Sequence, residues 1–304
     1  MLSTQLINRT VNNSGLNAWA ATKPVLPKHW KQRFQNWIEK GYYADMGWIT
    51  RNIDFRVNIK KKYSWCQSVL VFADNYYTPP VHRKNTPYVS NYAYGENYHQ
   101  IVIEKIESVA RQLSQFHSNL KFKAYVDTGP VLERAYAVEA GLGWMGKNNM
   151  IIINGLGSYC FLGILLLSEE IEEYGSPLPD KCCDCSKCID NCPTGALEDE
   201  YIHNSNKCLS FLTIEKKGDF SNREEKLITD TLYGCDVCQE VCPWNQKWAR
   251  QTKDSHYFER RDYLQKTKNE WGSLTLEEFK NKFSNSVFKR LKFKRLQRNL
   301  DALD

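Results

Sequence analysis

Apolar and polar residues follow each other in the first half of the chain at spacings that predict both helices and strands. Residues 68–76 are rich in β-branched and aromatic side chains and predict a buried strand. Residues 98–116 place apolar side chains at helical spacing and predict an amphipathic helix. Its expected buried face consists of Val102, Ile106, Val109, Leu113 and Phe116. A short strand is expected at 122–126, followed by a helix from 131 to 141 or 143.

Two further apolar segments, residues 150–154 and 159–168, predict strands that a hairpin-like turn at 154–157 connects. Residues 1–65 are expected to be helical and irregular. No apolar run approaches the roughly 18 residues that a membrane span needs. The pattern therefore predicts a mixed α+β domain over residues 1–175.

Two changes of composition divide the rest of the chain. Pro177 and Pro179 mark a linker into a cysteine-rich module, residues 176–250, and a charged tail follows over 251–304. The tail is expected to end in a basic helix that docks through an apolar stripe. The stripe consists of Leu276, Phe279, Phe283 and Val287.

The formal net charge of the 304-residue chain is +6, but the basic residues are unevenly distributed. Residues 280–298 contain eight Lys and Arg and no acid. A solvated helix face would explain some of this charge, and a phosphate backbone as the binding partner is the alternative.

The cysteines carry the strongest chemical signal. Eight of the eleven form two runs of ferredoxin type, C-x2-C-x2-C-x3-C-P, at 182–193 and 235–243, the second with its first cysteine displaced to Cys208. Thiolates at this spacing hold [4Fe–4S] clusters, and the cysteine before the proline ligates the other cluster. By that rule cluster one takes Cys182, Cys185, Cys188 and Cys242, and cluster two takes Cys192, Cys208, Cys235 and Cys238.

Zinc sites and a disulfide framework are the competing interpretations of these cysteines. The twofold C-P ending is not typical of zinc sites, and a disulfide framework suits short secreted chains. Cys183 is out of register, whereas Cys66 and Cys160 lie beside apolar runs and are expected to be buried, inert thiols. Because the thiolates must stay reduced and no targeting segment is recognised, we expect a cytoplasmic protein.

Several motifs resemble those of the epoxyqueuosine reductases, in order from about Tyr43 to the C-terminus. They are VDTGPV at 126–131, GLGWMGKN at 141–148, GS and FLG within 157–163, CLSFLTIE at 208–215, and YGCDVCQ with CPWN within 233–245. Jointly these motifs are highly specific.

The resemblance implies a nitroreductase-like α+β cobalamin domain with an inserted or appended bacterial-ferredoxin-like module and a C-terminal basic helix. It implies base-off cobalamin, reduced to Co(I) by an external low-potential donor through the two clusters. The reaction would convert epoxyqueuosine to queuosine at the wobble position of tRNAs with GUN anticodons (Asp, Asn, His and Tyr), the last step of queuosine biosynthesis. A monomer is expected.

The chain departs from the family pattern in two places. Members commonly carry Arg-Asp-Tyr-His before the long helix, where this chain reads Glu96-Asn97-Tyr98-His99, so that no acid stands at 97. Many members also continue into a helical-repeat domain where this chain stops, so that it resembles a short form.

Asp127 has two interpretations. Its place after a strand and before Thr-Gly-Pro is typical of an Asx-turn or a helix N-cap. The resemblance instead makes it the proton donor, with a pKa that an apolar corrin face would raise by desolvation. Tyr98 and His99 are expected to cap or pack, with no catalytic role.

The remaining site residues come from the resemblance and from charge. The expected cobalamin contacts are Arg56, Asp127, Trp144, Asn149, Ser158 and Ser210. The expected tRNA contacts, pointing outward from the tail, are Lys289, Arg290, Lys292, Arg295 and Arg298. Basic residues within 51–62 and at 83–84 are expected to bind further phosphates.

Two alternative functions remain open. A corrinoid reductive dehalogenase would use the same cofactors, but it usually needs an export signal and has no use for a basic tail. A two-cluster electron carrier would need little beyond residues 178–245, and the N-terminal domain is too large for that role.

Overall fold

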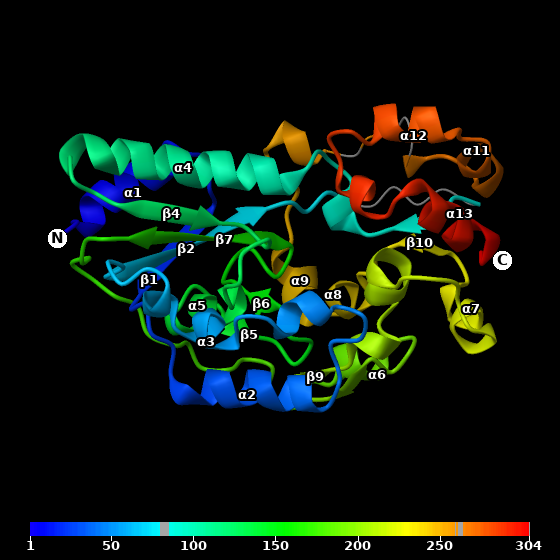
Figure 1. The fold of residues 1–304 in the computed structure, drawn as a ribbon, viewed down its shortest axis with the longest axis horizontal. Helices are drawn as coiled ribbons and strands as arrows, with labels where there is room; N and C mark the ends of the chain where they lie inside the picture. Colours follow the sequence, from blue (N-terminus) through cyan, green and yellow to red (C-terminus); the bar gives the residue numbers. More distant parts are fainter. Residues whose placement is uncertain (80–84, 259, 261–263, 304) are drawn as a thin grey trace.

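A four-stranded antiparallel sheet forms the centre of the computed structural model, which describes residues 1–79, 85–258, 260 and 264–303. The strand order is β1 (Ala18–Thr22), β2 (Ser68–Asn75), β7 (Cys160–Leu167) and β4 (Phe122–Tyr125). Strands β2 and β7 pair along their full length, from Ser68 opposite Leu167 to Asn75 opposite Cys160. Every residue of β2 is buried, because helices cover both faces of the sheet (Figure 1).

The two faces of β2 pack into two separate cores. Leu70 and Phe72 face α1 (Thr4–Asn12) and α4 (Tyr98–Phe116). The alternate residues face the opposite layer, which contains α2 (Lys28–Glu39), α3 (Ile53–Val57) and α5 (Glu133–Glu139). The first part of the chain is therefore a three-layer α/β/α sandwich, and the prediction of a mixed α+β fold is confirmed.

The predicted elements differ from the observed ones in four details. Helix α4 has the predicted bounds, but Phe116 at its end is 59% exposed and does not belong to the buried face. Strand β1 was not expected in residues 1–65. It forms because it pairs with β2, and its own sequence carries no strand pattern. Helix α5 begins two residues later than predicted. Strand β6 (Ile151–Ile152) pairs with β5 (Trp144–Met145) and not across the turn with β7.

The cysteine-rich module lies beside the sheet domain, and two short helices, α6 (Lys187–Asp190) and α8 (Val237–Glu240), begin within its two cysteine runs. A parallel pair of β3 (Tyr88–Val89) and β10 (Thr231–Tyr233) connects it to the loop after β2. Its other elements are β8 (Leu197–Asp199), β9 (Ile202–His203), the π-helical turn η5 (Phe211–Glu215), α7 (Asn222–Ile228) and α9 (Pro243–Trp248). Short 3-10 turns are η1 (Gly47–Thr50), η2 (Ile59–Lys61), η3 (Asn91–Ala93), η4 (Ser205–Lys207) and η6 (Ser255–Tyr257).

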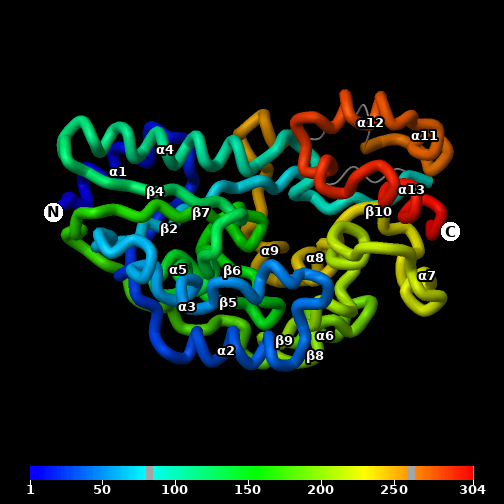
Figure 2. The backbone as a smooth tube through the Cα atoms, viewed as in Figure 1, coloured from blue at the N-terminus to red at the C-terminus, as the bar shows by residue number. Residues whose placement is uncertain are grey.

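The tail is not one basic helix. It forms short segments that pack on the module, so that the two termini lie at opposite ends of the long axis (Figure 2). The segments are α11 (Lys268–Gly272), α12 (Leu276–Lys282), η7 (Val287–Arg290) and α13 (Phe293–Asp301). Phe279, Phe283 and Val287 are buried as predicted, but Leu276 is 48% exposed because it begins α12 on the solvent side.

Core contacts cross the expected boundary at residue 251. The hydroxyl of Tyr257 donates to Oδ2 of Asp74 in β2 at 2.7 Å. The same buried carboxylate pairs with Lys105 of α4 at 2.6 Å. The beginning of the tail is therefore part of the sheet domain's packing, and the division into 1–175, 176–250 and 251–304 stays a prediction. Among the described residues, no helix is both long and apolar enough to cross a bilayer.

Candidate active site

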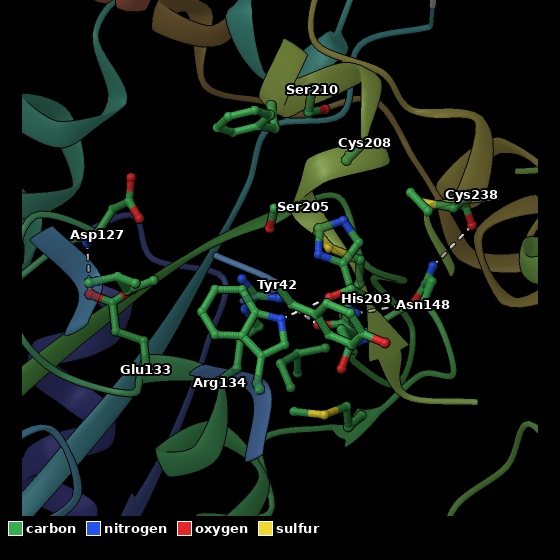
Figure 3. A pocket seen from close by; sticks show the side chains of 18 of the residues that line it. Tyr42, Asp127, Glu133, Arg134, Asn148, His203, Ser205, Cys208, Ser210 and Cys238 are labelled. Carbon is green, nitrogen blue, oxygen red and sulfur yellow. Dashed lines mark hydrogen bonds between the residues drawn. The ribbon is translucent and has the colours of Figure 1, made fainter. Parts of the chain in front are cut away.

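A cavity of about 1670 Å³ opens between the sheet domain and the cysteine-rich module. Asp127 and Glu133 lie on one side of it, and Cys208 and Cys238 lie on the other (Figure 3). Small-molecule pockets usually have volumes of roughly 300–1,000 Å³. This cavity is large enough for a large cofactor together with part of a substrate.

The side chain of Asp127 faces this cavity, and its backbone is in the left-handed region with φ of 55°. Its Oδ2 accepts a hydrogen bond from the Tyr98 hydroxyl at 2.8 Å and lies 3.3 Å from Nε2 of His99. Its backbone N–H donates to Oε1 of Glu133 at 2.7 Å. The helix-cap interpretation is wrong, because α5 begins only at Glu133 with Leu132 at its N-cap position.

The protonation of Asp127 depends on its neighbours. Burial raises the pKa of Asp127, but hydrogen bonds from His99 and Tyr98 outweigh it, and the pKa lies below its ordinary value. The raised pKa that the resemblance implies depends on desolvation by a bound corrin face and stays a prediction. Burial, with the neighbouring Asp127 charge, holds the pKa of Glu133 well above its ordinary value. Asp127 thus depends on a partner for its proton.

His99 is oriented to be that partner. Oδ1 of Asn97, the N-cap residue of α4, accepts the backbone N–H of His99 at 3.2 Å and lies 2.9 Å from its Nδ1. Because this amide oxygen is an acceptor, Nδ1 carries a hydrogen. The contact between Nε2 and Asp127 then requires one proton, shared by the two groups. Tyr98 and His99, expected only to cap or pack, belong to the site; a polar triplet at the start of a long helix was the available signal.

Two of the expected cofactor contacts lie in the cavity wall with polar groups available. Arg56 is 6% exposed, and its guanidinium donates to the backbone oxygens of Arg51 and Trp48. Oδ1 of Asn149 accepts from Arg33 at 2.6 Å, while its Nδ2 is buried without a partner among the described residues. A buried donor without an acceptor costs about 1–3 kcal/mol, which favours a ligand that supplies one.

Ser158 and Ser210 also line the cavity. Oγ of Ser158 accepts from Gln239 at 3.0 Å and from Asn245 at 2.9 Å, so that it ties the sheet domain to the module. Gly157 allows this contact, because its φ is 77° and an added Cβ would lie 2.4 Å from Oδ1 of Asn245. Ser210 begins the turn that follows Cys208.

Trp144 does not line the large cavity. Its side chain is 1% exposed and packs beside Cys182 and Cys242, with Trp244 and Trp248 around it. The expected contact with cobalamin is therefore wrong for Trp144, because β5 directs the indole toward the cluster-one cysteines.

The structure brings together the four cysteines expected for each cluster. The cluster-one cysteines line a cavity of about 180 Å³ of their own. The cluster-two cysteines all line the large cavity, opposite Asp127. Burial, reinforced by neighbouring cysteines and Asp236, raises the pKa of Cys235 to about 12 and that of Cys238 well above its ordinary value. Four cysteines gathered in this way could all be thiolates only with a positively charged centre between them.

The spacing of the cysteines bears on the kind of metal centre that they could hold. In the described part of the chain, no three Cys, His, Asp or Glu side chains converge as closely as one ion requires. The cavity between the cluster-one cysteines instead leaves room for a cube with iron at its corners. Cys183 points away, exposed and with φ of 46°, whereas Cys66 is fully buried and burial raises its pKa to about 11. Cys160 is partly buried in the wall of the large cavity, where burial raises its pKa.

The expected tRNA contacts divide into two groups. Arg295 donates to backbone oxygens of Ile214 and Leu291, and Arg298 donates to those of Leu212, Lys216 and Gly218. Arg290 pairs with Glu215. The expectation that Arg295 and Arg298 point outward is wrong, because their guanidinium groups bind backbone carbonyls in and around η5. The side chain of Arg290 stays 49% exposed and lines the large cavity, so its contact with tRNA stays a prediction. Lys289 and Lys292 are exposed, and residues 83–84 lie outside the described residues.

Comparisons with known proteins point in one direction. A family model whose description reads "4Fe-4S double cluster binding domain" matches residues 181–245, and one described as "Epoxyqueuosine reductase QueG, DUF1730" matches residues 56–128. An epoxyqueuosine reductase of Cellulophaga algicola is 32% identical over 89% of this chain and 88% of its own length. One of Synechocystis is 36% identical over 89% and 94%, and one of Salmonella typhimurium is 33% identical over 75% and 60%.

Solved structures give the same result. An epoxyqueuosine reductase with an epoxyqueuosine-modified tRNA-Tyr stem loop aligns with a TM-score of 0.88 and 28% identity, over 98% of this chain and 80% of that one. The reductase of Streptococcus thermophilus aligns with a TM-score of 0.88 and 26% identity, over 97% and 79%.

Proposed function

The chain belongs to the epoxyqueuosine reductase family, and we propose that it reduces epoxyqueuosine to queuosine at the wobble position of tRNA. One observation carries the proposal: the Asp127 carboxylate and the four cluster-two cysteines line the same cavity. In the proposed roles, a proton donor and an electron source would face one space. A reductive ring opening requires both.

The residues present fit the cofactors of such a reaction. The two sets of four cysteines would hold two [4Fe–4S] clusters, which supply single electrons when bound. Arg56, Asn149, Ser158 and Ser210 would hold a base-off corrinoid, whose cobalt would supply reducing equivalents to a carbon–oxygen bond. The volume of the cavity and the partnerless Nδ2 of Asn149 support this assignment. The helix-covered antiparallel sheet would then correspond to a nitroreductase-like cobalamin domain.

The protein's own residues would supply the protons. Conversion of the epoxide to an alkene consumes two electrons and two protons and releases water. The proton shared by His99 and Asp127 would pass from Oδ2 to the epoxide oxygen as the first C–O bond breaks. The Tyr98 hydroxyl keeps the carboxylate in place meanwhile. The pair then regains a proton for the departing oxygen.

The substrate and partners follow from the same assignment. We infer that the chain acts on tRNAs with GUN anticodons, with the wobble base turned into the cavity. Lys28, Arg33 and Lys40 line the cavity and would lie near the phosphates of an anticodon loop. Lys289, Lys292 and the cavity-lining Arg290 are exposed cations of the tail that would contact further phosphates. We further propose that an external donor of low potential supplies the electrons and that the protein acts as a monomer. Its location would be the cytoplasm, which keeps thiolates reduced.

The alternatives explain less. A reductive dehalogenase or a two-cluster carrier does not account for identity of 32–36% to epoxyqueuosine reductases along most of the chain. The direct test is mass spectrometry of tRNA nucleosides after incubation of the anaerobically prepared, cobalamin-loaded protein with epoxyqueuosine-containing tRNA and a reductant. Conversion to queuosine is expected, and unchanged epoxyqueuosine would contradict the proposal.

A further inference from the structure

Trp144 is buried beside two of the cluster-one cysteines. It pairs with Ile152 in the short β5–β6 ladder and is 1% exposed. Its ring meets Trp244 nearly at right angles, with centroids 5.3 Å apart. Cys182 and Cys242, two of the four cluster-one cysteines, belong to the same apolar cluster. The indole is thus held rigidly against that site.

The indole N–H of Trp144 has no partner among the described residues. The neighbouring Trp244 differs, since its Nε1 donates to the backbone oxygen of Lys181 at 3.2 Å. A buried donor without an acceptor costs about 1–3 kcal/mol and requires an explanation. The sulfur of Cys182 packs against the same apolar cluster as the Trp144 indole and would become a strong acceptor as a cluster ligand.

We propose that the indole N–H of Trp144 donates a hydrogen bond to the sulfur of Cys182 and thereby raises the reduction potential of cluster one. The inference rests on the cluster assignment in the proposed function and extends it to a positioned donor that acts on the cluster. Hydrogen bonds to the sulfurs of an iron–sulfur cluster stabilise the reduced, more negative state. Charges of both signs surround the site, because Lys181 and Lys187 lie near it while the Cys182 backbone N–H donates to Oδ1 of Asp180 at 2.7 Å, so the indole N–H is the contribution that a single substitution can isolate.

The consequence concerns the order of the two clusters. Cluster-two cysteines line the cavity where the substrate reacts, and cluster-one cysteines line a separate cavity behind it. A raised potential would make cluster one the first acceptor of electrons from an external donor. Trp144 would set that potential without touching substrate or corrinoid.

Trp144→Phe tests the inference, because phenylalanine keeps the aromatic packing and removes the N–H. In cobalamin-free protein, a redox titration followed by electron paramagnetic resonance should show two reduction steps. In Trp144→Phe, the midpoint potential of one step should be lower by about 59 mV. For a one-electron couple, this is a tenfold change of the equilibrium constant in favour of the oxidised cluster. Trp244→Phe is the matched control, since it removes an indole N–H from the same group that is already bonded to a carbonyl. An unchanged potential in Trp144→Phe, or an equal shift in both variants, would overturn the inference.

A second measurement requires no substitution at 144. With tryptophan labelled by ¹⁵N at the indole nitrogen, electron–nuclear double resonance of the Trp244→Phe protein should detect one nitrogen coupled to reduced cluster one. Absence of that coupling would overturn the inference. Iron analysis separates this result from the proposed function: fewer than about eight irons in the unsubstituted protein would instead contradict the two-cluster assignment.

Discussion

Nε2 of His99 lies 3.3 Å from Oδ2 of Asp127, and Oδ1 of Asn97 lies 2.9 Å from Nδ1 of the same imidazole, which orients the ring toward the carboxylate. The pair joins the start of α4 to the end of β4, two elements that are distant neither in sequence nor in space. Proton transfer would then depend on both side chains, and the role of each can be tested with its own substitution.

His99→Gln should keep a hydrogen-bond donor near Asp127 but remove the titratable ring. We expect turnover to fall by roughly ten- to a hundredfold, the usual range for lost acid–base assistance. Because glutamine cannot titrate, the pH–rate profile of the variant should also differ in shape from that of the unsubstituted enzyme. Tyr98→Phe is the control, because it removes a hydrogen bond to Asp127 and no proton source. A full pH–rate profile that is unaltered in His99→Gln would refute the shared-proton account.

Cys185→Ser should lose cluster one, since Cys185 lines the cluster-one cavity. Cys183→Ser changes a neighbouring cysteine that is exposed and points away, so iron content should stay near that of the unsubstituted protein. Iron and acid-labile sulfide analysis of both anaerobic variants checks this. Equal losses would mean that the ligand register is wrong.

Arg298→Ala should lower the free energy of unfolding by on the order of 3 kcal/mol. The guanidinium donates to backbone oxygens of Leu212, Lys216 and Gly218 and lies 4.0 Å from the Phe220 ring centroid. Its loss would leave the partly buried backbone oxygens of Leu212 and Lys216, and the exposed one of Gly218, without this donor. Thermal or urea unfolding measures the effect. Lys294→Ala, an exposed position on the same helix, should change stability little, and an equally small change in Arg298→Ala would show that the contacts are unimportant.

The exposed cations of the tail are expected to contribute to tRNA binding and not to the stability of the fold. Replacing Lys289 and Lys292 together with Ala should weaken tRNA binding and reduce the log–log salt slope by about two units, if each contacts a phosphate. Binding titrations at several salt concentrations measure the slope. With an unchanged slope, the tail would be a solvated surface and the tRNA would bind elsewhere.

Local patterns were sufficient for part of this molecule. The spacing of apolar residues predicted α4 closely, and the run of apolar residues predicted β2. In both elements the buried residues follow a pattern that is visible within the segment itself. The cysteine spacing predicted which four cysteines would meet, since the ligand rule fixes both clusters together.

Other features depend on contacts that no local pattern reveals. The charge of Arg295 and Arg298 could not show that their guanidinium groups bind the carbonyls of η5, more than eighty residues earlier. The resemblance around Trp144 implied a contact with cobalamin and was wrong, because the pairing of β5 with β6 decides the direction of the indole. Strand β1 is ordered by its partner and has no periodicity of its own.

The most direct test of the whole account is single-turnover reduction of epoxyqueuosine tRNA by Asp127→Asn protein loaded with cobalamin and both clusters. Asparagine keeps the size of the side chain and its contacts with Tyr98 but cannot pass on the shared proton. The account predicts intact clusters and cofactor with a rate roughly a hundredfold or more below that of the unsubstituted enzyme. A normal rate accompanied only by a lower melting temperature would contradict it and leave Asp127 with a structural role.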